Sequence, residues 1–234
     1  MRIKFGLVFY FCALASLLRA QTTLTQVDSG WYDSTGFHSQ LNQNYLIGSH
    51  SGLGYHDYFI FDLSQLSAGI VTSATLQIFN PSGGYISGNA NETFQAGSIS
   101  LPISTIDGSA FGNVSMYNAL SSGTTYGSQN VSSSDNGQWV NVSLNSDFLA
   151  AAQTQIGSGI VGLGGYLSGI TQSSSETIMF GAGGLLYGSA GGQQPANLIL
   201  TIEPAPEPSS LQLASIGCLF GLLAFRQSCC RKKV

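Results

Sequence analysis

Hydrophobic and polar side chains alternate with a period of two in two stretches of the chain. Between residues 55 and 63, one face carries Phe59, Phe61 and Leu63, and the other carries His56, Tyr58, Ile60 and Asp62. Between residues 74 and 80, Leu76 and Ile78 share a face opposite Thr75, Gln77 and Phe79. Because successive side chains of a β-strand point to opposite faces, this pattern predicts strands rather than helices.

Further short runs of β-branched and aromatic residues are separated by glycine, serine and asparagine. Together with the two above, the predicted strands are residues 44–48, 55–63, 74–80, 114–117, 139–144, 159–163, 177–180 and 198–202. Of the 30 glycines, 27 lie between residues 21 and 203, which is about twice their usual frequency. Many short strands joined by turns predict an all-β fold, a jelly-roll-like β-sandwich over residues 21–203.

One segment has helical character instead. Residues 147–156 combine Phe148, Leu149 and Ile156 with three alanines. Ser146 is suited to the N-cap, and Gly157 to the position just after the last turn. We therefore expect one short helix between two strands.

Two of the predicted strands resemble part of a known module. The run from Tyr58 to Ser64, followed by the run from Ser73 to Phe79, is similar to the sandwich modules of the DNRLRE type in exported bacterial surface proteins. The resemblance implies a β-sandwich that works outside the cytoplasm.

The first 20 residues have the order of an export signal. Arg2 and Lys4 precede an apolar run over residues 5–18, and the small residue Ala20 follows. This order predicts a secretory signal peptide over residues 1–20. A retained membrane anchor is the alternative, although the run is shorter than the about 20 residues that a spanning helix needs.

The last 31 residues, 204–234, divide into three parts. Residues 204–209 contain three prolines, which break helices and sheets. Residues 211–225 are apolar apart from Gln212 and Ser215, and four cations follow. A 15-residue helix is about 22 Å long, so bilayer thinning and snorkelling of the basic side chains would let it cross a membrane. The basic tail would stay in the cytoplasm and leave residues 21–203 outside.

This three-part end resembles the PEP-CTERM sorting signal of exported bacterial proteins. The signature is Pro206, Glu207 and Pro208, the membrane helix is residues 211–225, and the basic tail holds Arg226, Arg231, Lys232 and Lys233. The resemblance implies transient anchoring in the inner membrane and removal of the helix by an exosortase, in bacteria that make exopolysaccharide. The alternative is a permanent single-pass anchor, with Cys229 or Cys230 as palmitoylation sites.

Charges and cysteines are distributed unevenly. All seven lysines and arginines lie outside residues 21–203, whereas ten of the 11 carboxylates lie inside that range. A body without cations cannot neutralise phosphates, which excludes nucleic acids and phosphoryl transfer. The four cysteines, Cys12, Cys218, Cys229 and Cys230, also lie outside it, so we expect neither a disulfide nor a thiolate metal site there.

Residues 21–203 contain no common catalytic signature. A Gly-x-Ser-x-Gly elbow, a cysteine nucleophile and a His-Glu-x-x-His motif are all missing. Glycoside hydrolysis needs only two carboxylates, but Asp57 and Asp62 are five positions apart in one predicted strand and should point to opposite faces. We interpret both as groups that solvate a strand edge or cap a turn, and we expect neither catalysis nor a cofactor.

Metal binding has three candidate sites, one with histidines and two with oxygen ligands. The only histidines are His38, His50 and His56, of which the last two lie close to Asp57 in the sequence. Structural calcium is better suited to a chain rich in carboxylates and loop carbonyls, and its candidate oxygen ligands are Asp28, Ser29 and Asp33, or Asp135 and Asn136.

The aromatic residues suggest a sugar-binding platform. Its candidate members are Trp31, Tyr32, Tyr85, Tyr126 and Trp139, with Trp31 and Trp139 as the stacking residues; the alternative is that they pack in the core. The sequence favours an exported, non-catalytic protein of the cell envelope or extracellular matrix, with exosortase and exopolysaccharide as expected partners. A carbohydrate-binding module is the first alternative, and a secreted glycoside hydrolase is a distant second.

Overall fold

The computed structural model describes residues 20–39, 43–106, 113–170, 176–181 and 194–205. Apart from Ala20, the predicted signal peptide lies outside this range, as do the sorting motif Pro206 to Pro208, the apolar run at 211–225 and the basic tail. Within the described ranges, no helix has the length and apolar character required to cross a membrane. The contacts divide the chain into two units, Met1–Glu203 and Pro204–Val234.

The described residues are mostly β-strands. The strands are β1 (Ala20–Thr25), β2 (Asp28–Asp33), β3 (Ile47–His50), β4 (Leu53–Asp62), β5 (Gly69–Asn80), β6 (Glu92–Ser98), β7 (Thr125–Val131), β8 (Gln138–Leu144), β9 (Ile160–Leu167), β10 (Thr177–Met179) and β11 (Asn197–Pro204). Two α-helices, α2 (Val114–Ala119) and α3 (Ser146–Gln155), and two 3₁₀ turns, η1 (Ile103–Thr105) and η2 (Ser133–Asp135), complete the elements.

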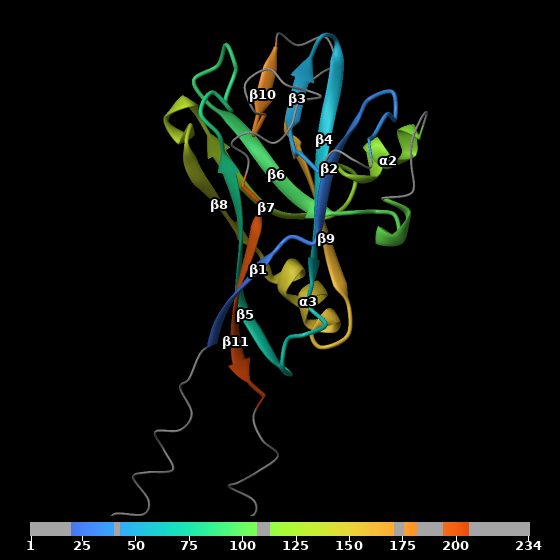
Figure 1. The fold of residues 1–234 in the computed structure, drawn as a ribbon, viewed down its shortest axis with the longest axis vertical. Coiled ribbons are helices and arrows are strands. Elements are labelled where there is room, and N and C mark those ends of the chain that lie inside the picture. Colours follow the sequence, from blue (N-terminus) through green and yellow to red (C-terminus); the bar gives the residue numbers. More distant parts are fainter. Residues whose placement is uncertain (1–19, 40–42, 107–112, 171–175, 182–193, 206–234) are drawn as a thin grey trace, which may run out of the picture. The chain divides into compact units, whose positions relative to one another are not determined.

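The strands form two sheets (Figure 1). The smaller sheet has the order β1-β11-β5-β8, and the larger has the order β10-β3-β4-β9-β6-β7, with β2 also paired to β4. In the smaller sheet, β1 runs antiparallel to β11, with Ala20 opposite Ile202 and Thr25 opposite Asn197. This arrangement of two sheets with few helices confirms the prediction of an all-β fold.

The main core lies between the two sheets. From the smaller sheet it receives Leu76, Ile78, Val142, Leu198 and Leu200, and from the larger sheet Phe59, Phe61, Phe94 and Leu163, all of which are fully buried. Burial of each such side chain contributes about 1.5–3 kcal/mol. The predicted alternation in residues 55–63 is confirmed, because Phe59, Phe61 and Leu63 all point into this core.

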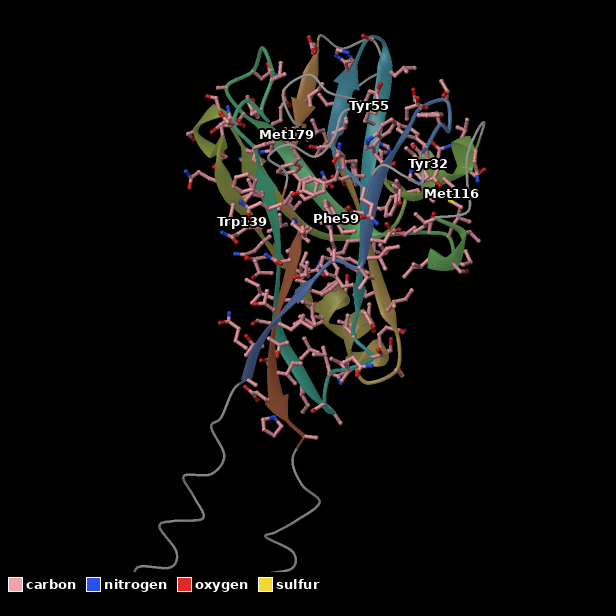
Figure 2. The ribbon with its side chains drawn as sticks, in the orientation of Figure 1. Tyr32, Tyr55, Phe59, Met116, Trp139 and Met179 are labelled. Atoms are coloured by element: carbon pink, nitrogen blue, oxygen red, sulfur yellow. The ribbon has the colours of Figure 1, made fainter. Side chains whose placement is uncertain are left out.

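The opposite face of β4 is buried too. Tyr58 and Ile60 join Tyr32, Ile106, Met116 and Leu120 in a second hydrophobic cluster. Tyr32 lies close to Met116, which belongs to α2 (Figure 2). The connection between β6 and β7, which contains η1 and α2, therefore covers this face of the larger sheet.

The strand predicted at residues 114–117 is wrong. These residues belong to α2, in which Met116 and Ala119 are the buried positions. Those two residues are three apart, which is a helical spacing. A run of four residues is too short for its apolar pattern to distinguish the two periods.

The helix predicted at residues 147–156 is confirmed as α3, which spans Ser146–Gln155. Its N-cap is Asn145 rather than Ser146, because Asn145 Oδ1 accepts hydrogen bonds from the amides of Asp147 and Phe148 at 3.0 and 3.2 Å. Gly157 follows the helix with a φ of +74°, a left-handed value that favours glycine.

Candidate functional site

His56 and Tyr117 form a stacked pair on the face of the larger sheet that α2 covers. His56 is in β4 and Tyr117 is in α2, and their ring centroids are 3.9 Å apart with an angle of 4° between the planes. The ring of Tyr166, in β9, approaches His56 edge-on at 5.8 Å. Three elements that are distant in the sequence therefore fix the position of this imidazole.

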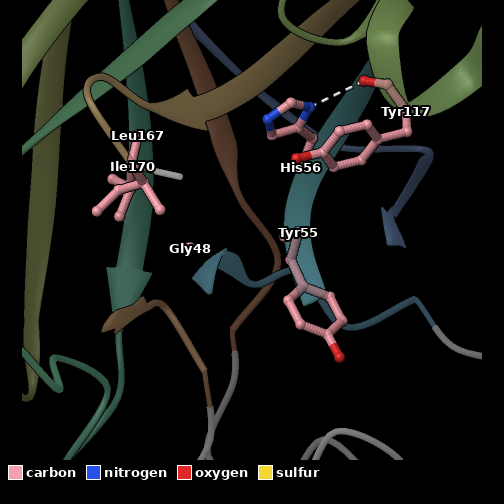
Figure 3. A pocket seen from close by; sticks show the side chains of 7 residues that line it. Gly48, Tyr55, His56, Tyr117, Leu167 and Ile170 are labelled. Atoms are coloured by element: carbon pink, nitrogen blue, oxygen red, sulfur yellow. Dashed lines mark hydrogen bonds between the residues drawn. The ribbon is translucent and has the colours of Figure 1, made fainter. Parts of the chain in front are cut away.

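A hydrogen bond fixes the tautomer of His56. Its Nδ1 is 2.8 Å from the main-chain oxygen of Tyr117 (Figure 3). A carbonyl oxygen can only accept, so Nδ1 carries the hydrogen and Nε2 carries a lone pair. No described residue makes a hydrogen bond to Nε2.

Burial keeps this imidazole neutral. It lowers the pKa of His56 from 6.5 to about 4, against a smaller opposing effect of the Tyr117 carbonyl. At neutral pH, His56 is therefore an uncharged side chain whose free ring nitrogen can accept a hydrogen bond.

The stacked pair borders a small open pocket of about 230 Å³. Its lining consists of Gly48, Gly54, Tyr55, His56, Tyr117, Leu167 and Ile170. The ring nitrogen of His56 that is not bound to Tyr117 faces the side where Leu167 and Ile170 lie (Figure 3). Gly54 leaves room for the Tyr117 hydroxyl, which a Cβ at this position would displace.

Asp57 follows His56 in β4 but points into the main core. The Asp57 side chain is fully buried, and neither of its carboxyl oxygens has a hydrogen-bond partner in the described part of the chain. It faces Gly165 of β9, where any Cβ would collide with Oδ1 and meet the ring of Phe94. Burial raises the pKa of this carboxyl well above its ordinary value, with a smaller opposing effect of its own backbone.

The interpretation of Asp57 as a strand-edge or turn-capping group is therefore wrong, whereas for Asp62 it is correct. Asp62 Oδ1 accepts a hydrogen bond from the Ser64 amide at 2.8 Å, as a turn cap does. Alternation along β4 places the two carboxyls on opposite faces of the sheet, as the sequence predicts. They cannot act as a converging acid pair.

The three histidines have different surroundings and do not form one site. His38 is buried, its Nδ1 is 3.0 Å from the Trp31 carbonyl oxygen, and its ring stacks on Tyr32 at 4.6 Å. His50 is more exposed and lies 2.7 Å from the Glu176 carboxylate. Within the described ranges, no three His, Cys, Asp or Glu residues are grouped as metal ligands.

The predicted calcium ligands form hydrogen bonds within local turns. Asp33 Oδ1 accepts from the amides of Thr35 and Phe37 at 2.8 and 3.0 Å, and from the Thr35 hydroxyl at 2.6 Å. Asp28 Oδ1 accepts from the Ser29 amide at 2.8 Å, at the opposite end of β2 from Asp33. The structure therefore does not bring Asp28 and Asp33 to one ion.

The second candidate calcium site is also engaged locally. Asp135 closes a capping box with Ser132 at the start of η2. The side-chain oxygen of Asn136 accepts from the Asn80 side-chain amide and the Tyr85 main-chain amide, at 3.0 and 2.8 Å. These bonds connect η2 to the end of β5.

Most of the predicted aromatic platform lies in the interior. Trp31, Tyr32, Tyr85 and Tyr126 are 1%, 0%, 8% and 9% exposed. Trp31 packs against Tyr55 and Phe37, so its ring has no open face for a sugar. Trp139 differs: it is half-buried on the outer face of the smaller sheet and contacts Phe79 edge to face at 5.4 Å (Figure 2).

Sequence reasoning missed the residues that surround His56. Tyr117 was expected in a strand, and Tyr166 and Leu167 lie just beyond the strand predicted at residues 159–163. The 61-residue separation of His56 and Tyr117 leaves no local pattern that would pair them. A search of known protein-family models and of curated proteins found no match to the chain.

Proposed function

We propose that this chain is an exported, non-catalytic protein of the cell envelope or extracellular matrix, delivered by an exosortase-type sorting system. The basic and apolar start, the Pro206-Glu207-Pro208 motif and the basic end support this proposal. The absence of lysine and arginine from residues 21–203 is consistent with a body that contacts no nucleic acid.

One structural observation supports the proposal most directly. The first and last strands of the body, β1 and β11, pair with each other, so Ala20 lies opposite Ile202. The signal peptide and the sorting segment therefore join the body at neighbouring points of one sheet. Because β11 ends at Pro204, cleavage at or after the motif leaves every described strand intact.

The strand order supports the jelly-roll form of the sandwich. Eight of the strands form the orders β1-β11-β5-β8 in one sheet and β4-β9-β6-β7 in the other. Among these eight, each consecutive pair lies in different sheets except β6 and β7, which pair with each other. A jelly roll has eight strands in two Greek keys and occurs in capsid and lectin domains. The other three strands are then additions: β2 and β3 pair with β4, and β10 pairs with β3.

Mass spectrometry of the exported protein tests the proposal. In an exosortase-positive host, the mature chain should begin near Gln21 and lack residues 211–234. In a host without exosortase, the chain should keep these residues and stay in the membrane. A surface protein that still carries Arg231 to Val234 in the exosortase-positive host contradicts the proposal.

A matched pair of variants makes the test specific. Replacement of Pro206, Glu207 and Pro208 by alanine should abolish the cut, because the recognised motif is gone. Replacement of Pro204 by alanine, just outside the motif, should leave the cut unchanged. Equal processing of both variants would show that the motif is not read.

A carbohydrate-binding role is the second candidate, and the outer face of the smaller sheet favours it. Around the Trp139–Phe79 pair this face presents uncharged hydrogen-bonding groups, including Gln77 and Asn141, which are joined at 2.7 Å. The body is negatively charged, so an acidic polymer would be repelled once it comes closer than the Debye length of about 8 Å. A glycan array with the exported protein and its Trp139→Ala variant tests this role; equal binding by both excludes this face.

A further inference from the structure

We infer that the pocket beside His56 binds one ring of a neutral sugar, at the end or in a branch of a glycan. This site is separate from the outer face of the smaller sheet, and it does not depend on sorting. Three properties of the pocket lead to the inference: its hydrogen-bonding groups, its lack of charge and its size.

The hydrogen-bonding groups require a ligand that donates. Nε2 of His56 is an acceptor whose direction is fixed by the contacts of the rest of the ring. Nδ1 is bound to the Tyr117 carbonyl, and the ring stacks on Tyr117 and makes a T-shaped contact with Tyr166. The Tyr117 hydroxyl lies over Gly54 at the pocket lining and can both donate and accept. A hydroxyl group of a sugar satisfies both partners.

The remaining lining selects against ions. Among the described residues, those that line the pocket include no carboxylate and no lysine or arginine. On the other side, Leu167 and Ile170 supply an aliphatic wall. A sugar ring combines an apolar C–H face, which can rest on such a wall, with hydroxyls at its edge, which can reach His56 and Tyr117.

The volume fits one ring. The pocket holds about 230 Å³, whereas an engineered cavity of about 150 Å³ takes up benzene. A six-membered ring with its hydroxyl groups therefore fits, and a second ring must extend into solvent. The site is suited to a chain end rather than to the middle of a long polymer.

Nitrogen NMR on the full-length chain tests the inference. The chain is labelled with ¹⁵N-histidine, kept in a detergent without sugar head groups, and titrated with glucose, galactose, mannose and N-acetylglucosamine. At least one sugar should shift the signal of the unprotonated His56 nitrogen, because that atom accepts the new hydrogen bond. The signals of His38 and His50 should not move.

Matched variants locate the binding. His56→Phe keeps a flat ring but removes the acceptor, and should weaken binding about tenfold, the effect of one hydrogen bond. Tyr117→Phe should weaken it several-fold, and His50→Phe, at the other half-exposed histidine, should leave it unchanged. If His56→Phe does not fold, the signal of the unaltered chain still decides.

Two results would overturn the inference. One is that no sugar shifts the His56 signal. The other is that the variants place the sugar elsewhere. This is the case if a folded His56→Phe variant binds as tightly as the unaltered chain, or if only Trp139→Ala abolishes binding, which would place the sugar on the smaller sheet. Neither result affects the sorting proposal, because processing at the motif is measured separately by mass.

Discussion

His56 and Asp57 are neighbours in β4, yet they lie on opposite faces of the larger sheet with opposite effects of burial on their pKa values. Burial lowers the pKa of His56 to about 4 and raises that of Asp57 well above its ordinary value. In both groups burial favours the neutral form over the charged form. Their contributions to stability must depend on pH in opposite directions.

Asp57 should make the fold less stable as the pH rises. Its folded-state pKa is raised above the unfolded value of about 3.8, so its contribution is fully present below pH 4 and is lost as the pH rises through the folded pKa. The loss is at most about 1.4 kcal/mol per pH unit. In urea unfolding, Asp57→Asn should therefore gain stability relative to the unaltered chain as the pH rises above 4. The control Asp62→Asn, at a carboxyl whose pKa the Ser64 hydrogen bonds lower, should show no such relative gain above pH 4.

His56 should make the fold less stable as the pH falls. Its pKa is 6.5 unfolded and about 4 folded, so the loss starts near pH 6.5 and ends near pH 4, on the order of 3 kcal/mol in total. Between these limits it opposes the effect of Asp57, and the unaltered chain should show a weak pH dependence. His56→Phe should then lose stability as the pH rises, whereas Asp57→Asn should gain it. Identical profiles for the two variants would contradict both assignments.

The two tryptophans should respond differently to truncation. Trp31 is 1% exposed and packed among aromatic rings, so Trp31→Ala should cost about 3–5 kcal/mol of unfolding free energy. Trp139 is half-buried at the surface of the smaller sheet, and Trp139→Ala should cost about 1 kcal/mol. Chemical denaturation of both variants gives the comparison, and equal losses would argue against this difference in burial.

The start of α3 allows a similar comparison between adjacent positions. Asn145 caps the helix, and its side-chain amide also donates to the Thr125 carbonyl at 3.0 Å. Asn145→Ala should lower the unfolding free energy by about 1–2 kcal/mol, whereas Ser146→Ala should change it by less than about 0.5 kcal/mol. Thermal or urea unfolding distinguishes them. A larger effect at Ser146 would restore the cap position expected from the sequence.

A reducing agent should leave the fold unchanged. All four cysteines lie outside residues 21–203, so the two sheets contain no disulfide that could be reduced. The circular dichroism spectrum should be that of a β-protein, with the same unfolding midpoint with and without dithiothreitol. A midpoint that falls on reduction would show that the terminal cysteines contribute to stability.

The sequence failed to predict four strands, β1, β2, β6 and β7. Two of them, β1 and β7, share a physical cause. The residues of β1, Ala20–Thr25, and of β7, Thr125–Val131, are mostly polar and show little alternation. Each of them pairs with a strand from another part of the chain: β1 pairs with β11, and β7 pairs with β6. Main-chain hydrogen bonds to such a neighbour define a strand even where the side chains carry no apolar signal.

The amino-acid sequence by itself determined the features that depend on local order and composition. Alternation fixed the core strands around Phe59 and Leu76, and the helical run fixed α3 to within one residue at its start. The distribution of charge is likewise read from the sequence alone, since all seven lysines and arginines lie outside residues 21–203. Only the tertiary structure decided that Asp57 is buried, that Trp31 is part of the interior, and that His56 stacks on Tyr117 beside a pocket. These features depend on which distant segments cover each face of a strand, because alternation divides the side chains between two faces but does not say what lies against either of them.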